Sequence, residues 1–268
     1  MKRIQLFEFE DFAWFPAPIR NAMTNLIVVL SKMTGAPAVI ASLIENTRKS
    51  FPFDQIIDMG SGSGGVMPMV VQELNQQDSS KPLNLRLTDL YPNPEFIEEI
   101  NRKKLPHIQY SQQSTDATDL SKVESGLKTM MNSFHHMPPE KARQILHSAQ
   151  QHQQPILIYE MSENRIPTIV WWLLLPLSLT ILALMTLFMT PFSRPLSWQQ
   201  LVFTYLIPII PICYAWDGQA SMVRMYTYED IQHLLPPPTS DYRWEIAPVT
   251  KADGKKLGYY IQGLPVGV

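Results

Sequence analysis

The sequence predicts an α/β fold: a mostly parallel sheet with helices on both faces, an antiparallel last hairpin and an inserted apolar helical hairpin. Short apolar runs alternate with helical patterns through residues 51–165, which is typical of parallel sheets. Asp253-Gly254 lies between two late strand-like runs and is a strong signal for an antiparallel hairpin. Residues 166–216 interrupt this alternation with an apolar segment that carries a single charged residue.

Composition divides the chain into four parts. Residues 1–50 combine an aromatic start with two helical patterns, and we expect them to form an N-terminal helical cap. Residues 51–165 are the α/β core, and residues 166–216 are a hydrophobic hairpin inserted into it. Residues 217–268 return to ordinary polarity, and we expect a helix and a β-hairpin there that complete the core.

Seven runs have the pattern of strands, and helical patterns separate most of them. The strands are expected at residues 55–59, 83–88, 108–111, 127–131, 155–160, 241–249 and 256–261. The helices of the core are expected at residues 66–74, 94–103, 139–150 and 228–235. Because ligands bind beyond the carboxyl ends of parallel strands, the residues that follow these strands are the candidates for a functional site.

Charge and cysteine content exclude several kinds of protein. The formal net charge is −2, and no run rich in Lys or Arg is present, so no nucleic-acid partner is expected. The single cysteine, Cys213, cannot form an intrachain disulfide or a cysteine-based zinc site. Because no His/Asp ligand spacing is evident either, no metal site is expected. Glu8, Glu10 and Asp11 interrupt the first residues, which therefore do not resemble a signal peptide.

The strongest motif is Asp58-Met59-Gly60-Ser61-Gly62-Ser63-Gly64-Gly65, directly after an apolar strand. Glycines let the backbone turn sharply and approach a ligand without an obstructing Cβ. The turn leads into a helix, whose N-terminal N–H groups favour an anionic group. The carboxylate of S-adenosylmethionine (SAM) and the pyrophosphate of a dinucleotide would both suit this turn.

Three acidic residues favour SAM over a dinucleotide. Asp58 stands two residues before the first glycine, where it would attract the ammonium of a methionine moiety and repel a pyrophosphate. Asp89 ends the second strand, where a carboxylate accepts from both hydroxyls of a ribose. Asp116 follows the third strand and would accept from an adenine amino group. An NAD-linked oxidoreductase is therefore disfavoured.

Residues 50–165 resemble the class I SAM-dependent methyltransferase family in the order and spacing of these motifs. Asp58-x-Gly60-x-Gly62-x-Gly64 is similar to the family's first motif, Asp89 to its ribose-binding acid, and Asp116-Ala117 to its adenine-binding element. Met131-Asn132-Ser133-Phe134-His135-His136-Met137 resembles the segment after the fourth strand in ubiquinone- and menaquinone-type methyltransferases. The resemblance implies a Rossmann-like seven-stranded methyltransferase sheet with SAM as cofactor. The cofactor-binding residues that we expect are Asp58, Gly60, Gly62, Gly64, Asp89, Asp116, Ala117 and Asn132.

The remainder of the chain resembles a bacterial branch of the same superfamily that carries an apolar hairpin. The segments that carry this likeness are Trp14-Phe15-Pro16, Pro208 to Pro211, Trp216-Asp217-Gly218 and Arg224-Met225-Tyr226-Thr227.

Two residues are candidates for the chemistry of methyl transfer, which requires alignment of the acceptor and sometimes removal of a proton. His136 follows the fourth strand and would act as a base or orient the acceptor. Its alternative is a packing role at a helix start beside Met137 and Pro138. Glu160 ends the fifth strand and would face the acceptor, and its alternative is a salt bridge with Arg165 or a solvated turn.

The apolar segment is long enough to meet a membrane. Residues 166–193 carry no charge. The length of this run exceeds the roughly 20 residues that cross a bilayer as a helix. Residues 195–216 are also uncharged, and Pro208 and Pro211 would bend them. The segment is either two spanning helices, a hairpin that dips into one leaflet, or an apolar flap over the active site of a soluble protein. Its length favours membrane association.

These observations predict a SAM-dependent methyltransferase that acts on a hydrophobic small-molecule or lipid acceptor at the membrane. The hairpin leaves and re-enters one sheet, so both of its ends lie on one side of the membrane. Because SAM is cytosolic, we expect the cytoplasmic membrane, with the catalytic domain facing the cytoplasm and membrane lipids around the hairpin. The alternative is a non-catalytic, SAM-binding or vestigial methyltransferase-fold scaffold at the membrane.

Overall fold

The computed structural model describes residues 2–267 and contains one seven-stranded sheet in the order β3-β2-β1-β4-β5-β7-β6. The strands are β1 (Gln55–Met59), β2 (Asn84–Asp89), β3 (Ile108–Ser114), β4 (Leu127–Met131), β5 (Ile156–Glu160), β6 (Tyr242–Thr250) and β7 (Lys256–Pro265). The first five strands are parallel, and β7 is antiparallel to both β5 and β6. The Rossmann-like sheet with an antiparallel last hairpin is therefore confirmed.

The helices form two groups, which belong to two compact units. They are α1 (Ala17–Thr34), α2 (Ala36–Ser50), α3 (Met67–Gln77), α4 (Pro94–Arg102), α5 (Pro139–Gln151), α6 (Thr168–Met189), α7 (Trp198–Leu201), α8 (Ile209–Arg224) and α9 (Tyr228–Leu234). The helical unit consists of Met1–Thr34 and Glu163–Asp230, and the sheet unit consists of Gly35–Ser162 and Ile231–Val268. The sequence grouped residues 35–50 with the N-terminal helix, whereas the structure groups α2 with the sheet, because α2 packs against α3.

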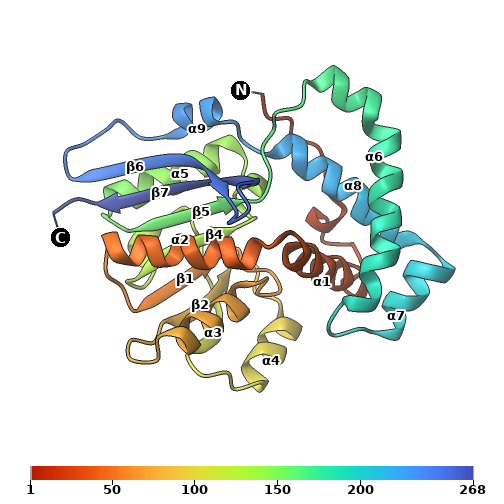
Figure 1. Cartoon of the computed structure of the whole chain (residues 1–268), viewed down its shortest axis with the longest axis horizontal. Helices are drawn as coiled ribbons and strands as arrows, with labels where there is room; N and C mark the ends of the chain where they lie inside the picture. Colours follow the sequence, from red (N-terminus) through yellow and green to blue (C-terminus); the bar gives the residue numbers. More distant parts are fainter. Residues whose placement is uncertain (1, 268) are drawn as a thin grey trace. The chain divides into compact units, whose positions relative to one another are not determined.

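In the sheet unit, helices cover both faces of the strands, with α2 in front of the sheet and α5 behind it (Figure 1). The central strands are buried, as expected for a parallel sheet covered on both sides. The carboxyl ends of β1 to β5 meet at one edge. Gly258 lets β7 lie against the end of β5, since a Cβ at this residue would lie 1.8 Å from the carbonyl oxygen of Glu160.

In the helical unit, α1 packs against the two arms of the apolar hairpin. Their shared core consists of buried residues from the N-terminal segment, α1, α6 and α8: Phe15, Ile19, Ala22, Met23, Leu26, Val29, Met189, Ile210, Cys213 and Tyr214. The apolar face of α1 is therefore a structural part of the hairpin's unit, although more than 130 residues separate α1 from α6 in sequence.

Buried charges fix the N-terminal segment to α8. The Arg224 guanidinium lies 3.0 Å from a carboxylate oxygen of Glu8 and 2.7 Å from one of Asp11. The Asp217 carboxylate accepts hydrogen bonds from the backbone N–H groups of Phe9 (2.8 Å) and Glu10 (3.3 Å). Asp217 lies inside α8, so these hydrogen bonds link that helix to the N-terminal segment.

The two arms of the hairpin differ in shape. Residues Thr168–Phe192, which include α6, have a mean hydropathy of 2.2 and are long and apolar enough to cross a membrane. The second arm bends by 83° between Trp198–Leu206 and Ile209–Arg224, and Pro208 stands at the break. The predicted bend is therefore confirmed at Pro208, whereas Pro211 lies inside α8, beyond the break.

Candidate cofactor-binding site

The glycine turn joins the end of β1 to α3. Gly62 and Gly64 have positive φ angles of 53° and 90°, which L-residues rarely adopt. A Cβ at Gly64 would lie 2.7 Å from Cδ1 of Ile100 and 3.1 Å from Cδ1 of Leu87, so this glycine allows close packing inside the fold. No atom lies within 4 Å of a Cβ built at Gly62. Gly62, like Gly65, is therefore a position of the turn with an open side for a ligand.

Asp58 connects β1 to the turn and to β4. Its Oδ2 accepts a 2.7 Å hydrogen bond from the Ser61 hydroxyl, and its Oδ1 accepts a 2.7 Å bond from the Thr129 hydroxyl. Burial raises the pKa of Asp58 to about 6, and the two hydroxyl groups oppose that shift. The hydroxyl bonds give Asp58 a role in holding the turn in place. Its attraction for a methionine ammonium stays a prediction.

Asp89 lies at the end of β2, directly beside the open glycine. Its Oδ2 accepts from the Gly62 N–H at 3.0 Å, and its Oδ1 accepts from the Tyr91 N–H at 2.9 Å. The Tyr110 hydroxyl of β3 donates to the Gly62 carbonyl oxygen at 2.7 Å. Burial and the nearby carboxylates raise the pKa of Tyr110, which keeps this hydroxyl a donor. Both backbone groups of Gly62 are thus held by side chains from the neighbouring strands.

The sequence did not indicate Tyr110 as a site residue. The only available signal was a tyrosine in a third strand whose one other apolar residue is Ile108, and this pattern gives no direction for the hydroxyl group.

Asp116 and Ala117 follow β3 in a tight turn. Asp116 Oδ1 accepts from the Thr118 backbone N–H at 2.9 Å and from the Thr118 hydroxyl at 2.7 Å, and these bonds lower the pKa of Asp116. The Asp116 side chain is exposed, and it lines a cavity of about 300 Å³ together with Thr88 and Ser114. Asp116 is thus close to the end of β2, and its contact with adenine stays a prediction.

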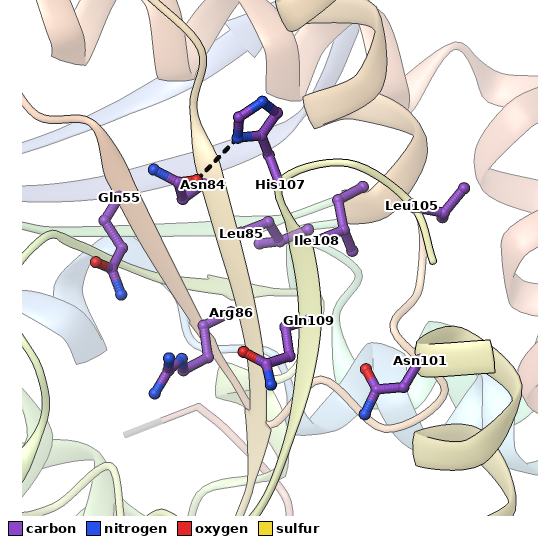
Figure 2. A pocket seen from close by; sticks show the side chains of 9 residues that line it. All are labelled: Gln55, Asn84, Leu85, Arg86, Asn101, Leu105, His107, Ile108 and Gln109. Atoms are coloured by element: carbon purple, nitrogen blue, oxygen red, sulfur yellow. Dashed lines mark hydrogen bonds between the residues drawn. The ribbon is translucent and has the colours of Figure 1, made fainter. Parts of the chain in front are cut away.

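A second cavity, of about 560 Å³, lies at the opposite edge of the sheet, at the amino ends of β1, β2 and β3 (Figure 2). Its lining includes Gln55, Asn84 and His107, and the ring nitrogen Nδ1 of His107 lies 3.0 Å from Oδ1 of Asn84. None of the predicted cofactor residues lines this cavity. Because ligands of parallel sheets bind at the carboxyl ends of the strands, we assign no function to it.

Asn132 and Ser133 lie between the glycine turn and β5. Asn132 has a positive φ of 54°, and its Oδ1 accepts from the Met161 N–H at 2.8 Å. Ser133 lies against the turn, since a Cβ at Gly60 would be 3.3 Å from the Ser133 hydroxyl oxygen. The segment after β4 therefore begins beside the candidate cofactor site.

Glu160 pairs with His135. Its Oε1 accepts from the His135 backbone N–H at 2.9 Å, and its Oε2 lies 2.8 Å from Nδ1 of the His135 ring. Both side chains are buried, which excludes the solvated turn considered for Glu160, and Arg165 pairs with Glu163 instead. His136, the histidine that the sequence favoured, lies beside the His135 ring, with a centroid distance of 4.3 Å and the two rings tilted by 36°. The sequence did not indicate His135 as the partner of Glu160, and the roles suggested for His136 and Glu160 in the chemistry stay predictions.

No protein-family model and no curated protein sequence matches this chain. Solved structures with a similar fold include the complex of LepI with SAM, with a TM-score of 0.42 and 12% identity. The match covers 81% of this chain and 44% of LepI. PigF with SAH (0.47, 11%) covers 87% of this chain and 56% of PigF. The methyltransferase domain of bacterial CtHen1-C (0.45, 10%) covers 85% of this chain and 97% of that domain. This chain thus spans about half the length of LepI and PigF.

Proposed function

We propose that this protein is a SAM-dependent methyltransferase that acts on a hydrophobic or lipid-like acceptor at the membrane. The observation that carries the proposal is the 3.0 Å hydrogen bond between the Gly62 N–H and the Asp89 carboxylate. It brings the acid that would bind the ribose next to an open position of the glycine turn, at the carboxyl ends of β1 and β2.

Each predicted residue has a distinct role in this proposal. Asp89 accepts from the ribose hydroxyls, Asp116 and Ala117 hold the adenine, and the glycine turn before α3 receives the carboxylate of the methionine moiety. The open side of Gly62 and the carboxylate beside it fit such a ligand. When bound, SAM supplies an electrophilic methyl group, and the residues of the chain bind and orient the reactants.

The proposed membrane attachment rests on the helical unit. Many large apolar side chains of α6 are exposed: Ile169, Val170, Trp172, Leu173, Leu174, Leu177, Ile181, Leu184 and Phe188. Only 22% of the most apolar window in Thr168–Phe192 is buried inside the protein. Contiguous apolar surface of this kind marks a membrane or protein contact, and the near absence of charge favours lipid. With SAM in the cytosol, the sheet unit faces the cytoplasm.

The internal partners of the site acids fit a second candidate, a vestigial methyltransferase-fold scaffold at the membrane. The carboxylates of Asp58 and Asp89 already accept hydrogen bonds from groups of the protein itself. A site that has lost its ligand or its chemistry would have such internal partners.

Calorimetric titration with SAM tests the cofactor assignment. Asp89→Ala removes two charge-assisted hydrogen bonds to the ribose, each about 1.5–3 kcal/mol, so the affinity should fall about tenfold or more. Asp78→Ala is the matched control, because Asp78 is an exposed acid in a turn at the other end of α3. Equal SAM affinity of the Asp89→Ala variant and the wild-type protein would remove Asp89 from the cofactor site.

A turnover assay distinguishes the proposed methyltransferase from the proposed scaffold. The purified protein is incubated with SAM labelled in its methyl group and with extracts of membrane lipids, and a sample without extract controls for automethylation. Label in the extractable fraction supports the methyltransferase. Tight SAM binding without any labelled product supports the scaffold.

A further inference from the structure

One face of α6 is exposed over the whole length of the helix. Its exposed apolar side chains recur every three or four residues from the first turn to the last: Ile169, Leu173, Leu177, Ile181, Leu184 and Phe188. The helix has 22 residues and is about 33 Å long, which is sufficient for one crossing of the hydrocarbon core of a bilayer. The exposed face therefore fits lipid either across a bilayer or along its surface.

The opposite face of α6 is covered by other parts of the helical unit. Near the start of the helix, Trp171 and Leu175 pack in a cluster with Ile4, Leu6 and Val223. Near its end, the helix packs with α1 and α8. These covering segments carry charged residues, among them Lys2, Arg3, Arg20, Lys32, Asp217 and Arg224. Because α6 itself carries no charge, the charges lie on the segments behind α6 and not on its exposed face.

The chain returns to the same sheet after the hairpin. β5 ends at Glu160, before the hairpin, and pairs with β7, which begins at Lys256, after the hairpin. A segment that leaves a sheet and returns to it crosses a membrane an even number of times. A crossing by α6 therefore requires a second crossing by the arm that follows it.

The second arm is poorly built for such a crossing. Its two pieces, Trp198–Leu206 and Ile209–Arg224, are about 14 Å and 24 Å long and meet at 83°, so neither piece reaches across the roughly 30 Å of hydrocarbon. Leu206 and Ile207 at the break are 77% and 52% exposed, and an exposed break inside a bilayer would leave backbone groups facing lipid. The longer piece also contains the buried carboxylate of Asp217. The shape of this arm therefore disfavours a pair of crossings.

The charge at the turn between the two arms leads to the same conclusion. Arg194 is the single charged residue in 166–216, and its side chain is exposed. Its guanidinium donates to the carbonyl oxygens of Pro191 at 2.9 Å and Ser193 at 2.7 Å. If α6 crossed the bilayer, this charge would lie on the far side, against the preference of positive residues for the cytoplasmic side. If α6 lies along the cytoplasmic surface, the same charge meets the anionic headgroups of that leaflet.

We propose that α6 lies in the plane of the membrane, with its exposed face immersed in the cytoplasmic leaflet and Arg194 among anionic lipid headgroups. The protein is then attached to one leaflet and does not cross the bilayer. This inference rests on the membrane attachment in the proposed function, and it identifies the partner as one anionic leaflet. A hydrophobic acceptor would then reach the protein from the cytoplasmic leaflet.

The depth of α6 in a bilayer distinguishes the two arrangements. Ile169→Cys, Leu177→Cys and Phe188→Cys are each made in a Cys213→Ala background and labelled with a nitroxide. Electron paramagnetic resonance then measures the depth of each label in vesicles of phosphatidylcholine and phosphatidylglycerol. We expect equal depths, about 5–10 Å into the boundary between headgroups and acyl chains. A label at residue 177 that lies about 12 Å or more deeper than the labels at both ends would overturn the proposal, because a spanning helix rises by about 1.5 Å per residue.

Two controls belong to the depth measurement. Gln112→Cys, on the exposed surface of the sheet unit, should keep its label in water. Cys213→Ala without a further cysteine should bind vesicles as the wild-type protein does. Water around all three labels on α6 would contradict the membrane attachment of the proposed function, and the inference with it. Unequal depths inside the bilayer would contradict the in-plane arrangement alone.

A second measurement leaves the interior of the protein unchanged. The protein is added from outside to vesicles that contain phosphatidylglycerol in the outer leaflet only. Arg194→Gln should bind these vesicles about fivefold more weakly than the wild-type protein, and both should bind equally to vesicles of phosphatidylcholine alone. Arg102→Gln, at an exposed residue in the last turn of α4, is the matched control and should bind as the wild-type protein does. Equal binding of Arg194→Gln and the wild-type protein to the asymmetric vesicles would overturn the proposal, because Arg194 would then lie away from the outer leaflet.

Discussion

The two units of the chain differ in the exposure of their large apolar side chains. Among the large apolar side chains that are exposed within residues 2–267, only Tyr91 and Val266 belong to the sheet unit. In the helical unit, Ile169 and Phe188 are each 76% exposed, although both lie in the most apolar part of the sequence. The sheet unit therefore has the surface of a protein in water, and the helical unit has a surface suited to an apolar solvent.

The interiors of the two units differ as well. The core of the helical unit includes hydroxyl and amide side chains of the hairpin, namely Thr186, Thr190, Ser193, Gln200 and Thr204, all of them buried. In water such groups would face the solvent, whereas in lipid they are more stable inside the protein. The two units of one chain are therefore suited to different solvents, and each of the following predictions tests one part of this difference.

The largest effect is expected on the exposed face of α6. Leu173→Asp combined with Leu177→Asp leaves the interior intact, since these side chains are 75% and 60% exposed. Each charge costs about 2.5–3.5 kcal/mol in the centre of a bilayer, so binding to lipid vesicles should fall about a hundredfold or more. Flotation with vesicles measures the bound fraction. Gln77→Asp combined with Gln112→Asp, on the exposed surface of the sheet unit, is the control and should leave binding unchanged.

Vesicle binding that survives the two charges on α6 would contradict attachment through this helix. Fractionation of the full-length protein is an independent test of membrane attachment. Recovery in the high-speed supernatant without detergent would favour the apolar flap of a soluble protein.

A smaller effect is expected from the buried charges of the helical unit. Arg224→Ala leaves the buried carboxylate of Glu8 without its guanidinium, and loss of one member of a buried pair costs about 3–5 kcal/mol. Residues 2–34 should then become sensitive to limited proteolysis, while the SAM affinity of the sheet unit should persist. Arg165→Ala, which removes an exposed pair with Glu163, is the control and should change little. A parallel loss of SAM affinity in Arg224→Ala would show that the two units do not unfold separately.

The smallest effect is expected from Asp58, whose burial raises its pKa from 3.8 to about 6. Between these two values the folded protein keeps a proton on Asp58 that the unfolded chain has released. The stability from the neutral carboxyl is therefore present below about pH 4 and is lost as the pH rises through about 6, an effect on the order of 1–3 kcal/mol. Asp58→Asn is neutral throughout and should not lose this stability. Urea unfolding of both proteins at about pH 4 and about pH 7 measures the difference.

Asp58→Asn also tests the role that the sequence suggested for this residue. If the Asp58 charge attracts a methionine ammonium, the variant should bind SAM more weakly at neutral pH while its melting temperature without ligand hardly changes. Unchanged SAM affinity together with altered stability would make Asp58 a purely structural acid that serves Ser61 and Thr129.

Local sequence rules were sufficient for most of the sheet. A buried parallel strand is a short apolar run, so β1 and β4 begin and end where the sequence predicted. The prediction for β3 ended at Ser111, whereas the strand continues to Ser114, because the polar residues there pair with the end of β2 across an irregularity in register. A polar strand end of this kind has no apolar pattern by which it could be recognised.

Only those residues of the candidate site that come at the ends of strands could be predicted from the sequence. The glycine turn, Asp89 and Asp116 each follow a strand, and the strand order brings them to one edge. The position of the His135 ring depends instead on its contact with Glu160, which lies 25 residues later. The sequence alone does not distinguish which of the two adjacent histidines makes this contact. The place of α1 in the helical unit likewise depends on partners in α6 and α8 that local patterns do not specify.

The composition of the helical unit has a consequence for synthesis on the ribosome. The segment of α1 ends at Thr34, and its partner α6 begins at Thr168, so 134 residues separate them. At about 5–20 residues per second, the apolar face of α1 emerges roughly 7–27 seconds before the helix that covers it. During this interval the nascent chain presents that face to chaperones or to the membrane surface. Early docking of α1 at the membrane would place the translating ribosome there before the hairpin is made.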